Sequence, residues 1–197
     1  MAQTTDPRER AEQHEVAEYG LLGLLRDAPS HGYALAADFA PEGRLGTILH
    51  LKMSQLYAYL HKLERHGWLV AHEDGAESIR PRRVFTLTDA GRETFDRWLA
   101  QPVAATRDVR LEFLVKLAFA LERDPALAAR LVSSQRAATA AWLGRLEAQV
   151  ASETEGPRRL DARALALRHR ILQSRATLAW LDEALAATGA GTGDGDG

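Results

Sequence analysis

One short segment constrains the fold of this chain more than any other. Residues 83–88 read RVFTLT, an alternating run of β-branched, aromatic and polar side chains that predicts a β-strand. The rest of the chain is dominated by Ala, Leu and Arg, and this composition favours helices. A shorter run at 68–72 and a turn-rich stretch between the two runs complete a two-stranded hairpin. We therefore expect a mainly α-helical protein with one small hairpin.

Two helices are predicted ahead of the hairpin by their apolar content and their breaks. Residues 16–26 (VAEYGLLGLLR) form a largely buried helix, which ends before Pro29 because proline cannot continue the helical hydrogen bonds. The hydroxyl of Ser30 can accept from the first amides of a second helix, which ends near Phe39.

A third helix is predicted at 53–66, where apolar residues recur at spacings of three and four. These residues are Met53, Leu56, Leu60 and Leu63. Gly67 suits the left-handed conformation that ends many helices, and a fourth helix follows the hairpin at 89–99. Three helices, a hairpin wing and a fourth helix make residues 16–100 a winged helix–turn–helix domain. Its third helix and hairpin tip would project towards duplex DNA.

The remainder of the chain is predicted to be helical and to mediate dimerisation. A linker at 102–108 precedes helices at 109–122, 125–150 and 160–187. We expect antiparallel helices in a dimerisation and regulatory domain at 108–187, a flexible arm at 1–15 and a disordered tail at 188–197.

The last helix carries a heptad-like apolar seam in steps of four and three residues, which is the pattern of a helix packed along another helix. Its members are Leu160, Ala164, Leu167, Ile171, Ser174, Leu178, Leu181 and Leu185. Two interpretations are open: the seam packs against 125–150 of the same chain, or it forms a dimer interface. In the second case the interface residues are Leu167, Ile171, Leu178, Leu181 and Leu185.

Charge and composition exclude some classes of protein. The net charge of −2 does not indicate a generally basic protein, but residues 44–92 hold eight Lys and Arg against five acidic residues. The chain has no cysteine, so neither disulfides nor thiolate metal sites are expected. It shows no run that resembles a signal peptide or a membrane span, so we expect a cytoplasmic protein with no membrane partner.

Three motifs occur in order around these elements: GLLGLLRDAPSHGYAL at 20–35, QLYAYLHKLERHGWL at 55–69 and RRVFTLTDAGRETFDRWL at 82–99. With these motifs the chain resembles the PadR family of bacterial transcriptional regulators. Residues 110–121 resemble the start of the helical C-terminal region of the family's longer members. The chain departs from the family at Met53 and Ala58, where proline is frequent. The resemblance implies a homodimeric repressor that binds a pseudo-palindromic operator and is released by a small-molecule effector or another signal.

The DNA-binding candidates lie on the third helix, on the wing and at the start of the second helix. They are Lys52, Ser54, Gln55, Tyr57, His61, Lys62, Arg80, Arg82, Arg83 and Tyr33. The amide of Gln55 can pair with adenine, Ser54 can reach a base or a phosphate, and lysines suit phosphates. The roles of Tyr57 and Tyr33 follow from the resemblance alone, and for Tyr33 packing is the favoured interpretation.

Each of these assignments has a plainer alternative. The polar face of the third helix can simply be solvated, and the wing arginines can pair with acidic residues across the hairpin. Those acidic residues are Glu73, Asp74 and Glu77. Trp98 is a weaker candidate for contact with an effector.

Two rival functions remain: a winged helix that binds another protein instead of DNA, and a small helical enzyme. Enzyme function is not expected because the chain has no HExxH, GxSxG, phosphate-loop or dinucleotide-binding motif. No metal or cofactor is expected.

Overall fold

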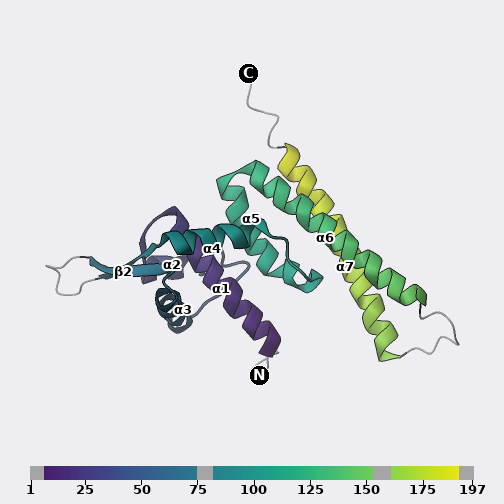
Figure 1. Cartoon of the computed structure of the whole chain (residues 1–197), viewed down its shortest axis with the longest axis horizontal. Coiled ribbons are helices and arrows are strands. Elements are labelled where there is room, and N and C mark those ends of the chain that lie inside the picture. Colours follow the sequence, from purple (N-terminus) through teal and green to yellow (C-terminus); the bar gives the residue numbers. More distant parts are fainter. Residues whose placement is uncertain (1–6, 75–81, 153–160, 191–197) are drawn as a thin grey trace, which may run out of the picture. The chain divides into compact units, whose positions relative to one another are not determined.

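The computed structural model describes residues 7–74, 82–152 and 161–190 (Figure 1). These residues form two compact units. The first holds the residues up to Ala100 together with Leu114–Phe119, and the second holds Gln101–Phe113 and the residues from Ala120 onwards. The described residues are mainly helical, with a small antiparallel sheet in the first unit.

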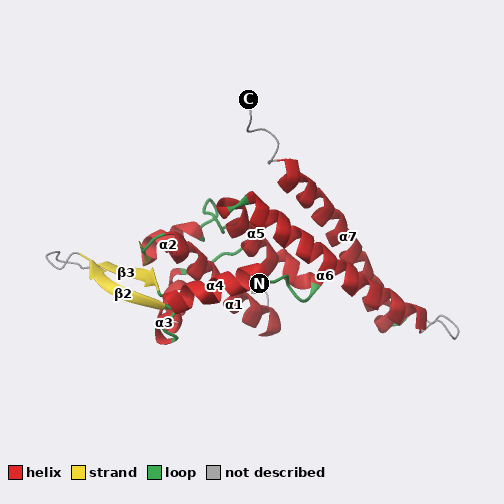
Figure 2. Cartoon of the chain, turned by 45° about the horizontal axis from the view of Figure 1, so that its top comes forward, coloured by secondary structure: helices red, strands yellow, loops and turns green. Residues whose placement is uncertain are grey.

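The first unit has the element order of a winged helix–turn–helix. Its elements are α1 (Pro7–Asp27), β1 (Ser30–His31), α2 (Gly32–Asp38), α3 (Met53–Arg65), β2 (Leu69–Asp74), β3 (Arg82–Leu87) and α4 (Asp89–Ala100), with part of α5 (Glu112–Arg123). Figure 2 shows β2 and β3 extending beyond the helices of this unit, as a wing does.

Helix α1 begins earlier than predicted. Residues 7–15 of the expected flexible arm are helical, whereas residues 1–6 lie outside the described residues. Proline fits the first turn of a helix, where its missing N–H has no intrahelical acceptor to lose. The residues after Pro7 (RERAEQH) include good helix formers, which explains the extension.

The sheet has three strands, of which β1 was not predicted. Its order is β1-β3-β2, with Ser30 opposite Phe85 and His31 opposite Val84. The prediction that Ser30 caps the second helix is wrong. His31 holds the cap position with an extended backbone and no side-chain cap, because β3 draws the chain before α2 into the sheet.

The predicted buried side of α3 is confirmed for Leu56, Leu60 and Leu63, which are completely buried, whereas Met53 at the start of the helix is 39% exposed. Phe85 of β3 and Phe95 of α4 are also completely buried. Burying a leucine side chain contributes about 1.5–3 kcal/mol, so this stripe fixes which side of α3 faces outwards.

The junctions around the wing depend on two small residues. Gly67 adopts a φ of 70°, the left-handed conformation predicted for it. Thr88 donates its hydroxyl to the Gly67 carbonyl at 2.7 Å and accepts from the Gly91 amide at 3.1 Å. Thr88 therefore ties the end of α3 to the start of α4.

The second unit consists of a 3-10 helix η1 (Thr106–Arg110), the ends of α5, and the long helices α6 (Pro125–Ser152) and α7 (Ala162–Ala190). The antiparallel α6 and α7 lie side by side (Figure 1). Asp124 caps α6 by accepting from the Ala126 amide at 2.8 Å, as its position before Pro125 predicts.

Two boundaries in this unit differ from the predictions. Part of the predicted linker forms η1, and α5 begins at Glu112 because Asp108 accepts from the Ala105 amide and stabilises the tighter turn. Helix α7 continues to Ala190, so residues 188–190 are not a disordered tail. There the Thr188 hydroxyl donates to the Leu185 carbonyl at 2.9 Å, whereas residues 191–197 lie outside the described residues.

The seam of α7 packs against α6 within the chain. Leu167, Ser174 and Leu181 are buried, while Ile171, Leu178 and Leu185 are half-buried. Ala164 is exposed, and Leu160 lies outside the described residues. The intramolecular interpretation therefore holds for the buried members of the seam, and a role of the seam in a dimer stays a prediction.

Candidate nucleic-acid interface

The outer face of α3 is polar, because its apolar residues Leu56, Leu60 and Leu63 point into the core. Ser54, Ala58, His61 and Arg65 lie on the side away from the stripe and are all exposed. An exposed helix of this kind fits the width of the major groove.

The start of α3 is fixed by one of the predicted base-reading residues. Lys52 holds the cap position, and its amide donates to Oε1 of Gln55 at 3.1 Å. The oxygen that would accept from adenine therefore already stabilises the helix start, while the NH2 group of Gln55 belongs to an exposed side chain. Sequence reasoning missed this second role of Gln55.

Lys62 has a partner that the sequence analysis did not identify. Its ammonium donates to Oε1 of Glu18 in α1 at 2.6 Å. Glu18 is only 6% exposed, whereas the side chain of Lys62 is 45% exposed. A buried carboxylate without a partner is costly, so this ion pair holds α3 to α1 and competes with the phosphate contact predicted for Lys62.

The same carboxylate affects a buried tyrosine of α3. Burial raises the pKa of the Tyr59 phenol above its ordinary value, and the negative charge of Glu18 raises it further. Tyr59 is therefore held neutral in the packing between α1 and α3.

A groove of about 680 Å³ runs between α1 and α3 beside this pair. Tyr19 and Glu15 line it from α1, while Gln55, Ala58 and Arg65 line it from α3. The groove therefore shares residues with the outer face of α3.

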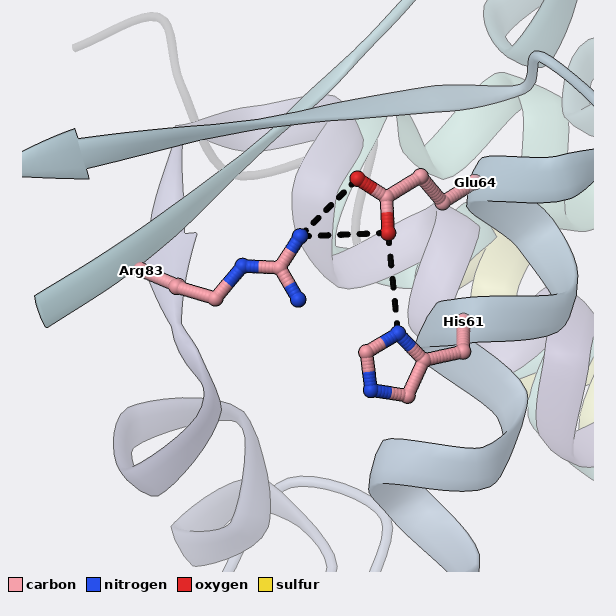
Figure 3. Close-up of polar contacts among 3 residues, drawn as sticks. All are labelled: His61, Glu64 and Arg83. Atoms are coloured by element: carbon pink, nitrogen blue, oxygen red, sulfur yellow. Dashed lines mark hydrogen bonds and ion pairs between the residues drawn. The ribbon is translucent and has the colours of Figure 1, made fainter.

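The wing meets α3 through a second carboxylate (Figure 3). Nη2 of Arg83 donates to Oε1 and Oε2 of Glu64 at 3.0 and 3.2 Å, and Nδ1 of His61 lies 3.6 Å from Oε2 of the same residue. The Arg83 guanidinium also lies 5.5 Å from the centre of the Phe85 ring. Glu64 therefore joins two predicted DNA-binding residues, one on each element.

This cluster corrects the alternative offered for Arg83. Glu73 lies opposite Arg83 in the hairpin register, yet the hydrogen bonds of Arg83 go to Glu64. The backbone of Arg82 pairs with that of Asp74 in the same ladder. Arg80 and Glu77 lie outside the described residues.

The two predicted tyrosines have opposite environments. Tyr33 is 72% exposed on α2, so the favoured packing interpretation is wrong for it. Tyr57 is half-buried and lies over the start of α2, where a Cβ on Gly32 would come within 2.5 Å of its hydroxyl oxygen. Gly32 therefore allows Tyr57 to pack closely against α2.

Trp98 is packed inside the first unit and is only 8% exposed. The centre of its ring lies 4.5 Å from that of the stacked Tyr19 ring and 5.7 Å from that of Phe95. The ammonium nitrogen of the buried Lys116 lies 4.8 Å from the centre of the same ring. An effector could stack on Trp98 only by displacing one of these side chains, so its predicted role stays a prediction.

The described residues contain no helix long and apolar enough to cross a membrane. Within these residues, no three or more His, Cys, Asp and Glu side chains are grouped so that they could hold a metal ion.

Two family models match the chain, one in each half. Residues 21–97 match the transcriptional regulator PadR-like family, and residues 109–188 match the virulence activator alpha C-terminal family. The first match covers the wing and α3, and the second covers α5, α6 and most of α7.

Curated relatives agree with these matches. The negative transcriptional regulator PadR of Bacillus subtilis is 32% identical over 104 residues, which are 53% of this chain and 56% of that protein. This alignment therefore spans little more than half of the relative. A probable transcriptional regulator of Mycobacterium tuberculosis is 27% identical over 178 residues, which cover 84% of this chain and 93% of the relative.

Crystal structures of Bacillus subtilis PadR are also similar in sequence. The complex with operator DNA is 26% identical, covers 87% of this chain and 98% of that chain, and has a TM-score of 0.41. The complex with p-coumaric acid is 26% identical, covers 94% of this chain and 98% of that chain, and has a TM-score of 0.39.

Proposed function

Because this chain carries a PadR-like transcriptional regulator domain, we propose that it is a dimeric, sequence-specific DNA-binding protein that represses transcription in the cytoplasm. The observation that carries the proposal is the exposed polar face of α3 beside Arg83 of the wing. The curated relatives named as transcriptional regulators support the same function.

In the proposed complex α3 enters the major groove. Ser54 and His61 face the bases, Gln55 offers its NH2 group, and the exposed Lys52 reaches a phosphate at the helix start. Tyr57 and Tyr33 contact the backbone. Lys62 helps to hold α3 in place and does not contact a phosphate in this proposal, because Glu18 already binds its ammonium.

The wing is proposed to contact the backbone or the minor groove through Arg80, Arg82 and Arg83. Phosphate contacts by such residues make affinity depend on salt, with a slope of roughly −0.9 for each neutralised phosphate. If the protein shows no salt-sensitive binding to DNA, the rival function is favoured, which is a winged helix that binds another protein.

The dimer is proposed to form through α7. Ile171, Leu178 and Leu185 are half-buried, and Leu165 and Leu172, seven residues apart, are 51% and 56% exposed. At about 100° per residue, Leu165 and Leu172 lie on the side of α7 away from the buried Leu167 and Leu181. A second copy can cover this second apolar stripe while the seam stays packed on α6. The dimer would then place two α3 helices in successive major grooves of a pseudo-palindromic operator.

Release from DNA is proposed to follow a signal that favours a different separation of the two α3 helices. Bacillus subtilis PadR has been crystallised with p-coumaric acid, which supports a small molecule as the signal. Trp98 remains the candidate contact, through displacement of Tyr19 or Lys116.

The experiment is fluorescence anisotropy with labelled DNA from upstream of the protein's own gene and from a selection on genomic fragments. We expect a specific site bound at nanomolar concentration and weakened steeply by salt. Lys52→Ala should weaken binding, whereas Arg130→Ala on α6, which removes an exposed arginine paired with Asp124, should not. No salt-sensitive binding to any fragment would overturn the proposal.

A further inference from the structure

We propose that Glu64 determines the specificity of DNA binding by holding the wing residue Arg83 against α3. This inference rests on the proposed DNA-binding function. Glu64 is not among the residues proposed to contact a base or a phosphate. Glu64 is therefore a positioning residue for Arg83.

The geometry restrains the guanidinium on two sides. Both hydrogen bonds from Arg83 to Glu64 use Nη2, so Nη1 and Nε take no part in this contact. The other terminal nitrogen of the guanidinium points away from the carboxylate in Figure 3. The Phe85 ring lies 5.5 Å from the same guanidinium. Arg83 can thus present Nη1 to DNA while Nη2 stays bound to Glu64 beside α3.

Charge gives Glu64 a second effect at the same junction. It is the one acidic residue among residues 53–66, and it faces both Arg83 and His61. Its negative charge offsets a wing cation where the DNA backbone would pass. Non-specific binding needs only positive charge near phosphates, whereas specific binding needs donors in fixed positions. Glu64 therefore weakens non-specific binding and favours the specific complex.

The test compares Glu64→Ala and Glu64→Gln with the wild type on the specific site and on a random duplex of equal length. We expect affinity for the random duplex to rise roughly fivefold and its salt slope to steepen by about 0.9. Affinity for the specific site should not rise in step, so the ratio of the two affinities falls. The matched control is Glu93→Ala, which removes the same charge from α4, where Glu93 accepts from Arg97 at 2.8 Å.

A double variant identifies the path of the effect. Adding Glu64→Ala to Arg83→Ala should lower the affinity ratio less than Glu64→Ala lowers it in the wild type, because the restrained group is gone and only the effect of the charge remains. An unchanged or higher ratio in both Glu64 variants, with a wild type that binds its site specifically, overturns this inference alone. A wild type that binds no DNA overturns the proposed function as well. Thermal unfolding of Glu64→Gln, which keeps a hydrogen-bond acceptor, checks that the fold is intact.

Discussion

Helices α3 and α7 both carry regular apolar stripes, but they use them differently. The stripe of Leu56, Leu60 and Leu63 in α3 is wholly buried, and the opposite face of the helix is polar. The seam of α7 is also packed within the chain, yet Leu165 and Leu172 leave apolar surface on its other side. The difference supports the two proposals made above, that α3 meets DNA and that α7 meets a second copy of the chain.

The largest effect that tests this comparison is the loss of a core leucine. Leu60→Ala should reduce the free energy of unfolding by about 2–5 kcal/mol, since it removes a fully buried side chain and leaves a cavity. Leu172→Ala, on the exposed side of α7, should change the stability of the single chain by about 0.5 kcal/mol or less. Urea denaturation at low protein concentration measures both. Equal losses would remove the distinction between the two helices.

The next effect concerns assembly. Replacing Leu165 and Leu172 together by Asp should raise the dimer dissociation constant by about a hundredfold, equivalent to about 2.7 kcal/mol, because charged groups would be buried in the interface. Sedimentation equilibrium measures the constant, and circular dichroism checks that the helices persist. Gln173→Asp adds a charge at an exposed position on another side of α7 and should leave the dimer intact. An unaffected dimer in the double variant would move the interface elsewhere.

The predictability of these regions depends on how local their interactions are. The stripe of Leu56, Leu60 and Leu63 is set by helical periodicity, so the third helix and its buried side followed from the sequence. The pairing of Ser30 with Phe85 did not, because a strand of two residues has no periodicity and depends on a distant partner. The seam of α7 predicted packing against a helix but could not say which helix.

The candidate site was predictable in outline but not in its ion pairs. Glu18 and Lys62 are 44 residues apart, and Glu64 and Arg83 are 19 apart. One signal was available: Glu18 interrupts the apolar run of the first helix, and a carboxylate at a buried position needs a partner. Glu64 belongs to the PadR-like motif at 55–69, but nothing in that motif indicated Arg83 as its partner.

A smaller effect tests whether α3 depends on α1 for its position. Lys62→Ala should cost about 1–2 kcal/mol of stability, because it leaves Glu18 buried without its partner. Glu18→Gln in the same background should recover part of the loss, which a thermodynamic cycle of the four proteins measures. If Lys62→Ala instead weakens DNA binding strongly with unchanged stability, Lys62 is a phosphate contact as first predicted.

The smallest effect is a pH dependence at Tyr59. Because burial and Glu18 raise the pKa of this phenol in the folded protein, the folded state keeps its proton at pH values where the unfolded chain loses it. The contribution is fully present below the ordinary tyrosine pKa of about 10 and is lost as the pH rises through the higher folded value. Urea denaturation between pH 9 and pH 11 should therefore show a steeper loss of stability in the wild type than in Tyr59→Phe, which cannot ionise. Parallel curves would mean that the packing between α1 and α3 does not disfavour a charge at Tyr59, and that α3 is held to α1 less tightly than its buried contacts indicate.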